Sequence, residues 1–141
     1  MERVVITKEQ YFGKKQYPIE HEANADWMLA AVNLLLHHAV QEGAYDYWTD
    51  PDTGTQISGS KGGAGDGGYR TVDSKTGSPR SSHKLAKAVD VYDPDNKLDD
   101  WVTDEILIKY NLYREHPDYT NTWVHLSTKP PGSGLRTFRP Y

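Results

Sequence analysis

Two histidines and an aspartate stand out in the sequence as residues that could hold a metal ion. His83 and Asp90 lie seven residues apart in the segment SSHKLAKAVD, and His125 lies much later, in TWVHLS. Neutral imidazole and carboxylate groups are good ligands for zinc. Three protein ligands leave a fourth position for water, as in catalytic rather than closed structural sites. By residue type these three side chains could form a catalytic-type Zn²⁺ site, whereas a histidine in an aromatic strand is more often a hydrogen-bonded core residue.

Composition limits the other kinds of chemistry. The chain has no cysteine, which excludes disulfides and thiolate metal ligands. A net charge of -4 argues against a nucleic-acid partner bound through its phosphates.

The segment MERVVITKEQYF lacks the apolar core of a signal peptide, and no apolar run is long enough to span a membrane. We expect a protein of the producing cell's cytoplasm that reaches a cell wall or virion by a separate route.

Two predicted strands position the candidate ligands. The segment AVDVY at 88–92 alternates and is β-branched, which favours a strand containing Asp90. The segment TWVHLS at 122–127 also alternates, so Trp123 and His125 should share one face. If these strands are adjacent, they present Asp90 and His125 together, and the preceding loop brings in His83.

The remaining pattern predicts an α+β domain over residues 1–141, with a small antiparallel sheet packed on a buried helix. Residues 27–40 are apolar almost all round, which indicates a helix buried on most sides and ended by Gly43. Residues 98–113 show a helical pattern with a break near Thr103. Shorter strands are expected at 3–7, 56–58 and 136–138.

Several segments are expected to be loops or turns. Residues 8–23 have no clear period, and the glycine-rich stretch at 61–68 is flexible by composition. The acidic residues Asp93, Asp95 and Asp99 hint at calcium, but no glycine stands where an EF-hand loop turns. A turn and a helix cap explain these acids better.

The sequence resembles the zinc D-Ala-D-Ala carboxypeptidase family in three features. These are Ser81-x-His83, an Ala-x-Asp that ends at Asp90, and a late Trp near His125. That family includes the dipeptidases of vancomycin resistance and the L-alanyl-D-glutamate endolysins of phages, and it shares its fold with the hedgehog signalling domain. The resemblance implies that His83, Asp90 and His125 bind zinc. It also implies that Arg70 approaches a substrate carboxylate, which a planar guanidinium suits, and that Ser81 lies near the substrate.

The sequence departs from the family pattern at three positions. Ala86 replaces a glycine, which is tolerated if the backbone angle there is ordinary. Val124 separates the Trp from the His. Thr122 stands where the family has a carboxylate that acts as general base and then as acid to the leaving amine. Asp118 and Glu115 are the nearest acids that could replace it, and Asp118 is the candidate catalytic residue.

Three hypotheses follow from the resemblance, which spans roughly residues 24–128. The first is a zinc peptidase that cleaves peptidoglycan stem or cross-link peptides, encoded by a phage as an endolysin or virion-associated lysin. The second, suggested by Thr122, is a catalytically inactive zinc-bound domain of the same fold that binds a peptide, the cell wall or a virion protein. The third is that the motif is accidental and binds no metal.

Overall fold

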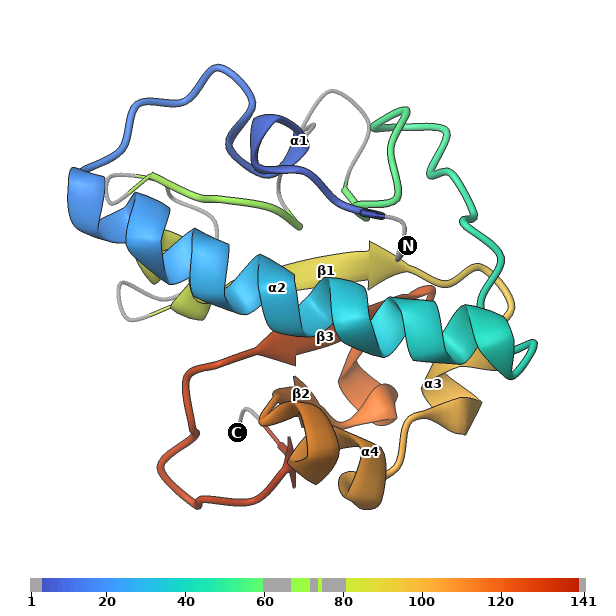
Figure 1. The fold of residues 1–141 in the computed structure, drawn as a ribbon. Helices are drawn as coiled ribbons and strands as arrows, with labels where there is room; N and C mark the ends of the chain where they lie inside the picture. Colours follow the sequence, from blue (N-terminus) through green and yellow to red (C-terminus); the bar gives the residue numbers. More distant parts are fainter. Residues whose placement is uncertain (1–3, 60–66, 72–73, 75–80, 140–141) are drawn as a thin grey trace.

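A long helix and a four-stranded sheet dominate the computed structural model, which describes residues 4–59, 67–71, 74 and 81–139 (Figure 1). The elements in chain order are α1 (Lys8–Phe12), α2 (Ile19–Gln41), η1 (Ser82–Leu85), β1 (Ala88–Tyr92), α3 (Lys97–Trp101), α4 (Asp104–Tyr110), β2 (Tyr113–Glu115), η2 (Pro117–Tyr119), β3 (Trp123–Ser127) and β4 (Thr137–Phe138). The α+β class predicted from the sequence is confirmed. No helix among these residues is long and apolar enough to cross a membrane.

The sheet is mixed rather than antiparallel, so the sequence prediction of an antiparallel sheet was wrong in part. Its strand order is β1-β3-β2-β4, and β3 runs antiparallel to both of its neighbours. The chain leaves β3, loops around through residues 128–136 and returns along the far edge of β2 as β4 (Figure 1). Because β4 thus runs opposite to β3, it is parallel to β2, with Arg114 paired to Thr137.

Helix α2 begins eight residues before the start predicted from apolar periodicity. Its first two turns are polar, so they carry no apolar repeat. Pro18 precedes the helix with φ -66°, and the Asn24 side chain donates a hydrogen bond to the carbonyl of Leu85 at 2.9 Å. The C-terminal prediction was correct, since the helix ends at Gln41 and Gly43 follows with φ 74°.

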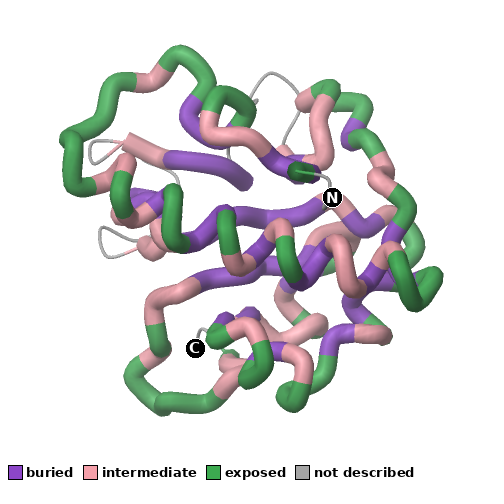
Figure 2. Tube along the Cα trace, in the orientation of Figure 1, coloured by how far each residue is buried: buried purple, intermediate pink, exposed green. Residues whose placement is uncertain are grey.

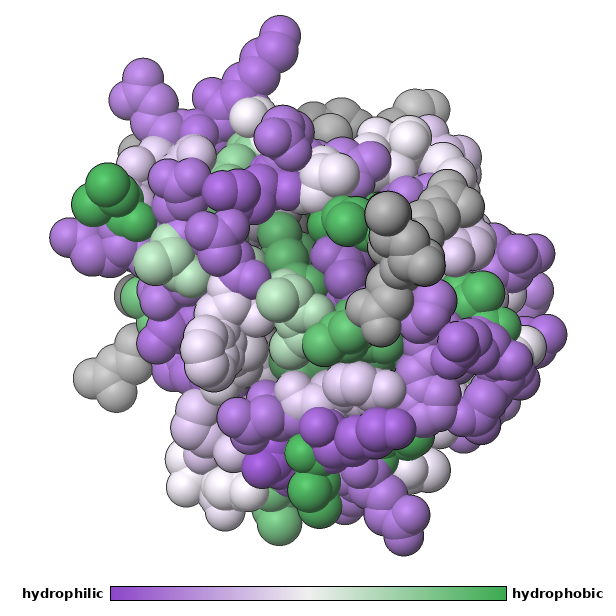
Figure 3. Space-filling model, viewed as in Figure 1, coloured by the Kyte–Doolittle hydropathy of each residue, from purple (hydrophilic) through white to green (hydrophobic). Residues whose placement is uncertain are grey.

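The prediction that this helix is buried on most sides was wrong. Trp27 is 70% exposed and Leu34 is 42% exposed, on a face that looks away from the sheet. The opposite face supplies the core residues Ala25, Met28, Leu29, Val32, Leu35, Leu36 and Ala39. Figure 2 shows this division along α2, while β1 and β3 behind it are buried almost throughout. In Figure 3 hydrophobic side chains reach the surface in the middle of this view, where α2 crosses it.

The N-terminal segment forms a helix where a strand and a loop were expected. Residue 3 lies outside the described residues, and residues 4–7 form no strand. The backbone N–H groups of Val5 and Ile6 both donate to the side-chain oxygen of Asn33 on α2, at 2.9 Å. Thr7 and Gln10 then form a capping box that starts α1 inside the predicted loop at 8–23.

The predicted strand at 56–58 is reduced to one bridge, between Ile57 and Val91. The segment does lie along the free edge of β1, because the Ser58 N–H donates to the Asp90 carbonyl at 2.9 Å. The Ile57 carbonyl accepts instead from the hydroxyl of Thr53 at 2.7 Å. That local turn ends the pairing after a single bridge.

The break predicted near Thr103 is confirmed. Helix α3 ends before it and α4 begins after it, with the Thr103 hydroxyl accepting from the Ile106 N–H as an N-cap. Asp93 caps α3, since its two carboxylate oxygens accept from the N–H groups of Leu98 and Asp99 at 3.0 and 2.9 Å. Asp93 therefore serves as a helix cap, as expected, whereas the Asp99 carboxylate pairs with Arg114 instead.

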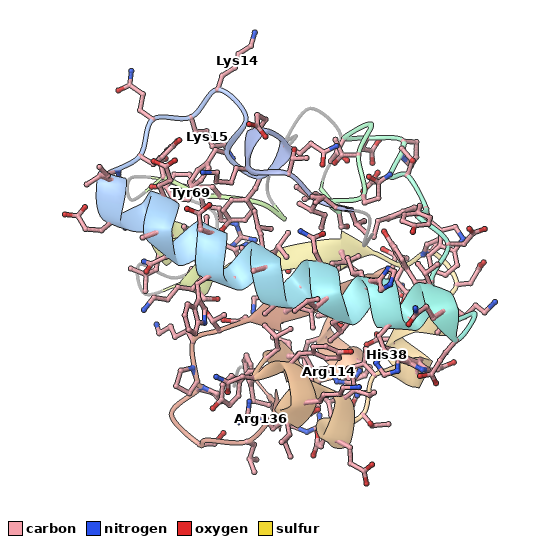
Figure 4. The ribbon with its side chains drawn as sticks, viewed as in Figure 1. Lys14, Lys15, His38, Tyr69, Arg114 and Arg136 are labelled. Carbon is pink, nitrogen blue, oxygen red and sulfur yellow. The ribbon has the colours of Figure 1, made fainter. Side chains whose placement is uncertain are left out.

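Strands β1 and β3 match the predicted segments, whereas β2 was missed because only three residues of it are regular. Arg114 in β2 turns its side chain toward α3, where Nη1 lies 2.9 Å from a carboxylate oxygen of Asp99 (Figure 4). Its Nε donates to the hydroxyl of Thr137 on β4 at 3.1 Å. This buried pair ties β2, α3 and β4 together below the long helix.

Candidate metal centre

Three side chains from distant parts of the sequence meet at one buried point. Asp90 on β1 stands directly opposite His125 on β3, and Nδ1 of His125 lies 2.9 Å from Oδ1 of Asp90. His83, in η1, places Nε2 at 3.2 Å from the same Oδ1 and at 3.3 Å from Nδ1 of His125. The residues predicted as ligands are therefore brought together, and as a group they could hold a metal ion.

The spacing of the three donor atoms fits a tetrahedral ion. Ligands bound to zinc at about 2.0 Å in a tetrahedral arrangement lie about 3.3 Å from one another. The observed separations are 2.9, 3.2 and 3.3 Å, which is nearly one face of such a tetrahedron. The donor set also suits zinc, because it combines two imidazole nitrogens with one carboxylate oxygen.

The site is buried and strongly polarised. His83, Asp90 and His125 are 3%, 8% and 4% exposed. Burial by itself raises the pKa of the Asp90 carboxyl, but the charge of His83 and hydrogen bonds from both histidines outweigh it and hold that pKa well below its usual range. Burial by itself lowers the pKa of His125. The hydrogen bond and the charge of Asp90, with a smaller contribution from the charge of Glu115, outweigh burial, so the pKa of His125 is raised overall.

Two hydrogen bonds orient His83. The Ser81 hydroxyl accepts from the His83 backbone N–H at 3.3 Å and so caps η1. On the ring, Nδ1 lies 2.9 Å from the Gly68 carbonyl oxygen, which leaves Nε2 facing Asp90 and His125. A second partner of this kind commonly fixes the orientation of a metal-binding histidine.

The last glycines of the glycine-rich stretch form part of the site. Residues 60–66 lie outside the described residues, so the prediction of a flexible loop there stays a prediction. Gly67 accepts from the Asp90 N–H at 2.7 Å. A Cβ at Gly67 would stand 2.0 Å from the Ser58 carbonyl oxygen and 3.0 Å from Cβ of Asp90. Only glycine can therefore sit at this position without moving β1 or its neighbour.

Ala86 does not have the ordinary backbone angle that would make it an easy replacement for glycine. It ends η1 in the left-handed region, with φ 57° and ψ 36°, and its N–H reaches the carbonyls of Ser82 and His83. Non-glycine residues pay a steric cost in that region. The methyl group is fully buried in the core, which offsets part of this cost.

Arg70 is held next to the site by an anchored neighbour. Tyr69 is 1% exposed and its hydroxyl lies 2.9 Å from Nδ1 of His21, beside the first turns of α2 (Figure 4). The Arg70 N–H donates to the His83 carbonyl at 3.2 Å. The backbone of Arg70 is thereby attached directly to the turn that holds His83.

Two cavities open beside the candidate ligands. The larger, of about 500 Å³, is lined by Arg70, Asp90, Tyr92, Thr122 and Trp123 among others. The smaller, of about 330 Å³, is lined by Ser81, Glu115, His125, Ser127 and Lys129 among others. Asp90 faces one cavity and His125 the other, so the metal centre lies between them. Both residues expected near a substrate, Arg70 and Ser81, are on these walls.

Thr122 lies on the wall of the larger cavity, at the turn before β3. Its φ is 74°, an unfavourable value for a β-branched residue, and its carbonyl accepts from the Asp93 N–H at 2.8 Å. A hydroxyl is present here where the sequence motif led us to look for a carboxylate. Thr122 cannot act as a base near neutral pH.

The two acids considered as replacements differ in position. The Asp118 side chain is 65% exposed and pairs with Arg139 at 3.2 Å, and it is not among the residues that line either cavity. Glu115 belongs to β2 rather than to a loop, and it lines the same cavity as His125. The sequence placed both acids in a loop, because the three-residue strand β2 leaves no periodic signal around Glu115.

No family model, curated protein or solved structure matches this chain.

Proposed function

We propose that the chain is a zinc-dependent peptidase that cleaves stem or cross-link peptides of peptidoglycan. The observation that carries this proposal is the triangle of donor atoms from His83, Asp90 and His125, whose 2.9–3.3 Å edges fit one face of a tetrahedral zinc site. The sequence resemblance to zinc D-Ala-D-Ala carboxypeptidases and phage endolysins supports the peptidoglycan substrate, the hedgehog-like fold and a phage origin.

Each of these residues has a defined task. His83, Asp90 and His125 would hold the ion, and a bound zinc supplies a Lewis acid that polarises a carbonyl group and lowers the pKa of water. Burial of the three side chains keeps bulk water away, which strengthens electrostatic interactions at the centre. Ser81 and Gly68 keep His83 in the orientation that directs Nε2 toward Asp90 and His125, with which it would hold the ion.

The cavities support a substrate that extends to both sides of the metal. Arg70 lines the larger cavity together with Asp90, so a peptide carboxylate bound by Arg70 would lie beside the ion. The cavity beside His125 would take the part of the peptide on the other side of the cleaved bond. Peptidoglycan stem peptides combine free carboxylates with amide bonds and fit this arrangement.

Digestion of purified peptidoglycan tests the proposal. The zinc-loaded protein should release defined peptides, read by mass spectrometry, and His83→Ala should release none. His37→Ala is the matched control, because His37 lies on α2 and lines neither cavity beside the metal centre. Absence of any release by the parent protein with zinc fully bound would contradict a peptidase.

The role of Arg70 is tested separately. Removing a charged hydrogen-bond donor to a substrate costs about 1.5–3 kcal/mol, so Arg70→Ala should raise KM about tenfold or more. Lys109→Ala, which removes a positive charge on the outer side of α4, should leave KM unchanged. Equal effects of both substitutions would mean that Arg70 acts only through the overall charge.

Thr122 favours one alternative, a zinc-bound domain of the same fold without turnover. Such a domain would bind a peptide, the cell wall or a virion protein, and zinc would be retained for stability. It predicts saturable binding of peptidoglycan or of a virion partner, a large loss of melting temperature on chelation, and no released peptide. The digestion above separates the two functions.

A further inference from the structure

We propose that Glu115 is the proton-transfer residue of this centre, in place of the carboxylate that is missing at Thr122. This assignment rests on the proposed peptidase function. It differs from the sequence-based choice of Asp118, and it follows from the position of β2 in the sheet.

The register of the sheet puts Glu115 next to a candidate ligand. Tyr113 pairs with Ser127 and Arg114 with Leu126, so continuing the antiparallel register places Glu115 opposite His125. Directly opposed residues share a face, with Cβ atoms about 4.5–5.5 Å apart. Since Asp90 is opposite His125 on the other side, the three side chains form one row across β1, β3 and β2.

Neighbouring residues confirm which way Glu115 points. Arg114 turns to the opposite face, where it pairs with Asp99, and alternation then directs Glu115 toward the face of the metal centre. Glu115 lines the cavity of about 330 Å³ together with His125 and Ser81. It is close enough for its negative charge to act on His125.

The carboxylate is available for chemistry. Glu115 is half-buried, and within the described part of the chain its side chain has no hydrogen bond or ion pair. No partner that the structure describes holds it away from the cavity that it lines together with His125. Asp118, by contrast, is paired with Arg139 on the surface.

The reaction assigned to Glu115 is a pair of proton transfers. Water attacks the carbonyl carbon of the peptide bond, and Glu115 accepts the proton that the water loses. The C–N bond then breaks, and Glu115 gives this proton to the leaving nitrogen, which departs as an amine. One water is consumed, and a carboxylic acid and an amine are formed, so no other reactant is needed.

Glu115→Gln tests the assignment, with Glu105→Gln on the exposed side of α4 as the matched control. The zinc content of both should equal that of the parent, and peptide release by Glu115→Gln should be slower by about 10²–10⁴-fold. The affinity for a product peptide, which the protein does not cleave further, should stay within about twofold of the parent value, because glutamine keeps the shape of the cavity wall. Asp118→Asn should retain the parent rate.

A positioning role would give a different result. If Glu115 acted only through His125, its loss would weaken zinc binding by about 10–100-fold, and saturating zinc would restore the rate. That outcome would overturn the proposal, as would an unchanged rate in Glu115→Gln or a loss confined to Asp118→Asn. A second variant, Glu115→Ala, avoids any question of whether glutamine fits the site. Added formate supplies the missing carboxylate and should restore its activity, and no restoration by formate would also contradict the proposal.

These results are separable from the proposed function itself. Release of peptides by the parent, abolished in His83→Ala, supports the peptidase whatever Glu115 does. Release by the parent that persists in Glu115→Gln removes only the role of Glu115. No release by the zinc-loaded parent removes both.

Discussion

Asp90 and His125 stand directly opposite each other on β1 and β3, with 2.9 Å between Oδ1 and Nδ1. Each of them alone is an ordinary buried polar residue in a strand. Their pairing, with Nε2 of His83 at 3.2 Å from the same oxygen, creates a cluster that a divalent cation would stabilise.

Zinc should stabilise the folded protein. At a free zinc concentration of 100 times the Kd, the free energy of unfolding rises by about 2.7 kcal/mol, or about 10 °C in Tm. In His83→Ala most of this shift should vanish, while His37→Ala should retain it. Thermal melts with zinc and with a chelator measure the effect. An equal shift in His83→Ala would mean that zinc binds elsewhere.

Zinc binding should strengthen as pH rises through the titration range of His125. Because Asp90 raises the pKa of His125, the imidazole beside it keeps its proton to a higher pH than an ordinary histidine, and that proton must leave before Nδ1 can bind zinc. In the metal-free protein the pair of Asp90 and His125 stabilises the fold at pH values above the usual pKa of an aspartate. This stabilisation is lost as the pH rises through the raised pKa of His125. Calorimetry in buffers of different ionisation enthalpy counts the released protons. Binding without proton release would contradict this account.

Gly67→Ala should destabilise the protein and weaken zinc binding. The added methyl group would stand 2.0 Å from the Ser58 carbonyl oxygen and press on Asp90, and overpacking of this kind costs about 1–3 kcal/mol. Gly132→Ala is the matched control, because nothing lies within 4 Å of its added Cβ. Urea unfolding and zinc titration measure both effects. Equal stability of the two variants would show that the close approach at Gly67 is relieved cheaply.

Thr122→Asn should raise the free energy of unfolding by about 1 kcal/mol. The φ of 74° costs a β-branched residue about that much, and asparagine tolerates this region better. The comparison variant is Thr128→Asn, whose φ is not positive and which should gain nothing. Denaturation of both in the presence of zinc checks the difference. A loss of stability in Thr122→Asn would indicate that the hydroxyl has a structural role.

Burial of the Asp99 carboxyl should make the free energy of unfolding fall as the pH rises. Burial raises the pKa of the Asp99 carboxyl from 3.8 to about 6, although Arg114 lowers it. The folded state therefore holds this proton more tightly than the unfolded chain, so stability decreases as pH rises between these two values, by up to about 3 kcal/mol. Asp99→Asn should flatten the dependence. Identical slopes for parent and variant over that pH range would contradict the assignment.

The two strands that contain Asp90 and His125 were predictable because their signals are local. The alternation of AVDVY and TWVHLS is a property of neighbouring residues, and it led directly to the strands that contain Asp90 and His125. The same holds for the break at Thr103, where a single capping residue separates two helices. The polar first turns of α2 escaped prediction because a helix can be held by its caps and contacts without an apolar repeat.

The sequence by itself determined which side chains could bind zinc and which strands contain two of them. It also determined that Thr122 cannot act as a general base. The tertiary structure decided the register that sets His125 opposite Asp90, the cavity that His125 shares with Glu115, the fit of Gly67 against β1, and the parallel return of β4 beside β2. These features depend on which residues meet across strands far apart in the chain. Alternation sets which residues share a face, but a shift of two residues would keep the faces and separate Asp90 from His125, and no local pattern excludes that shift.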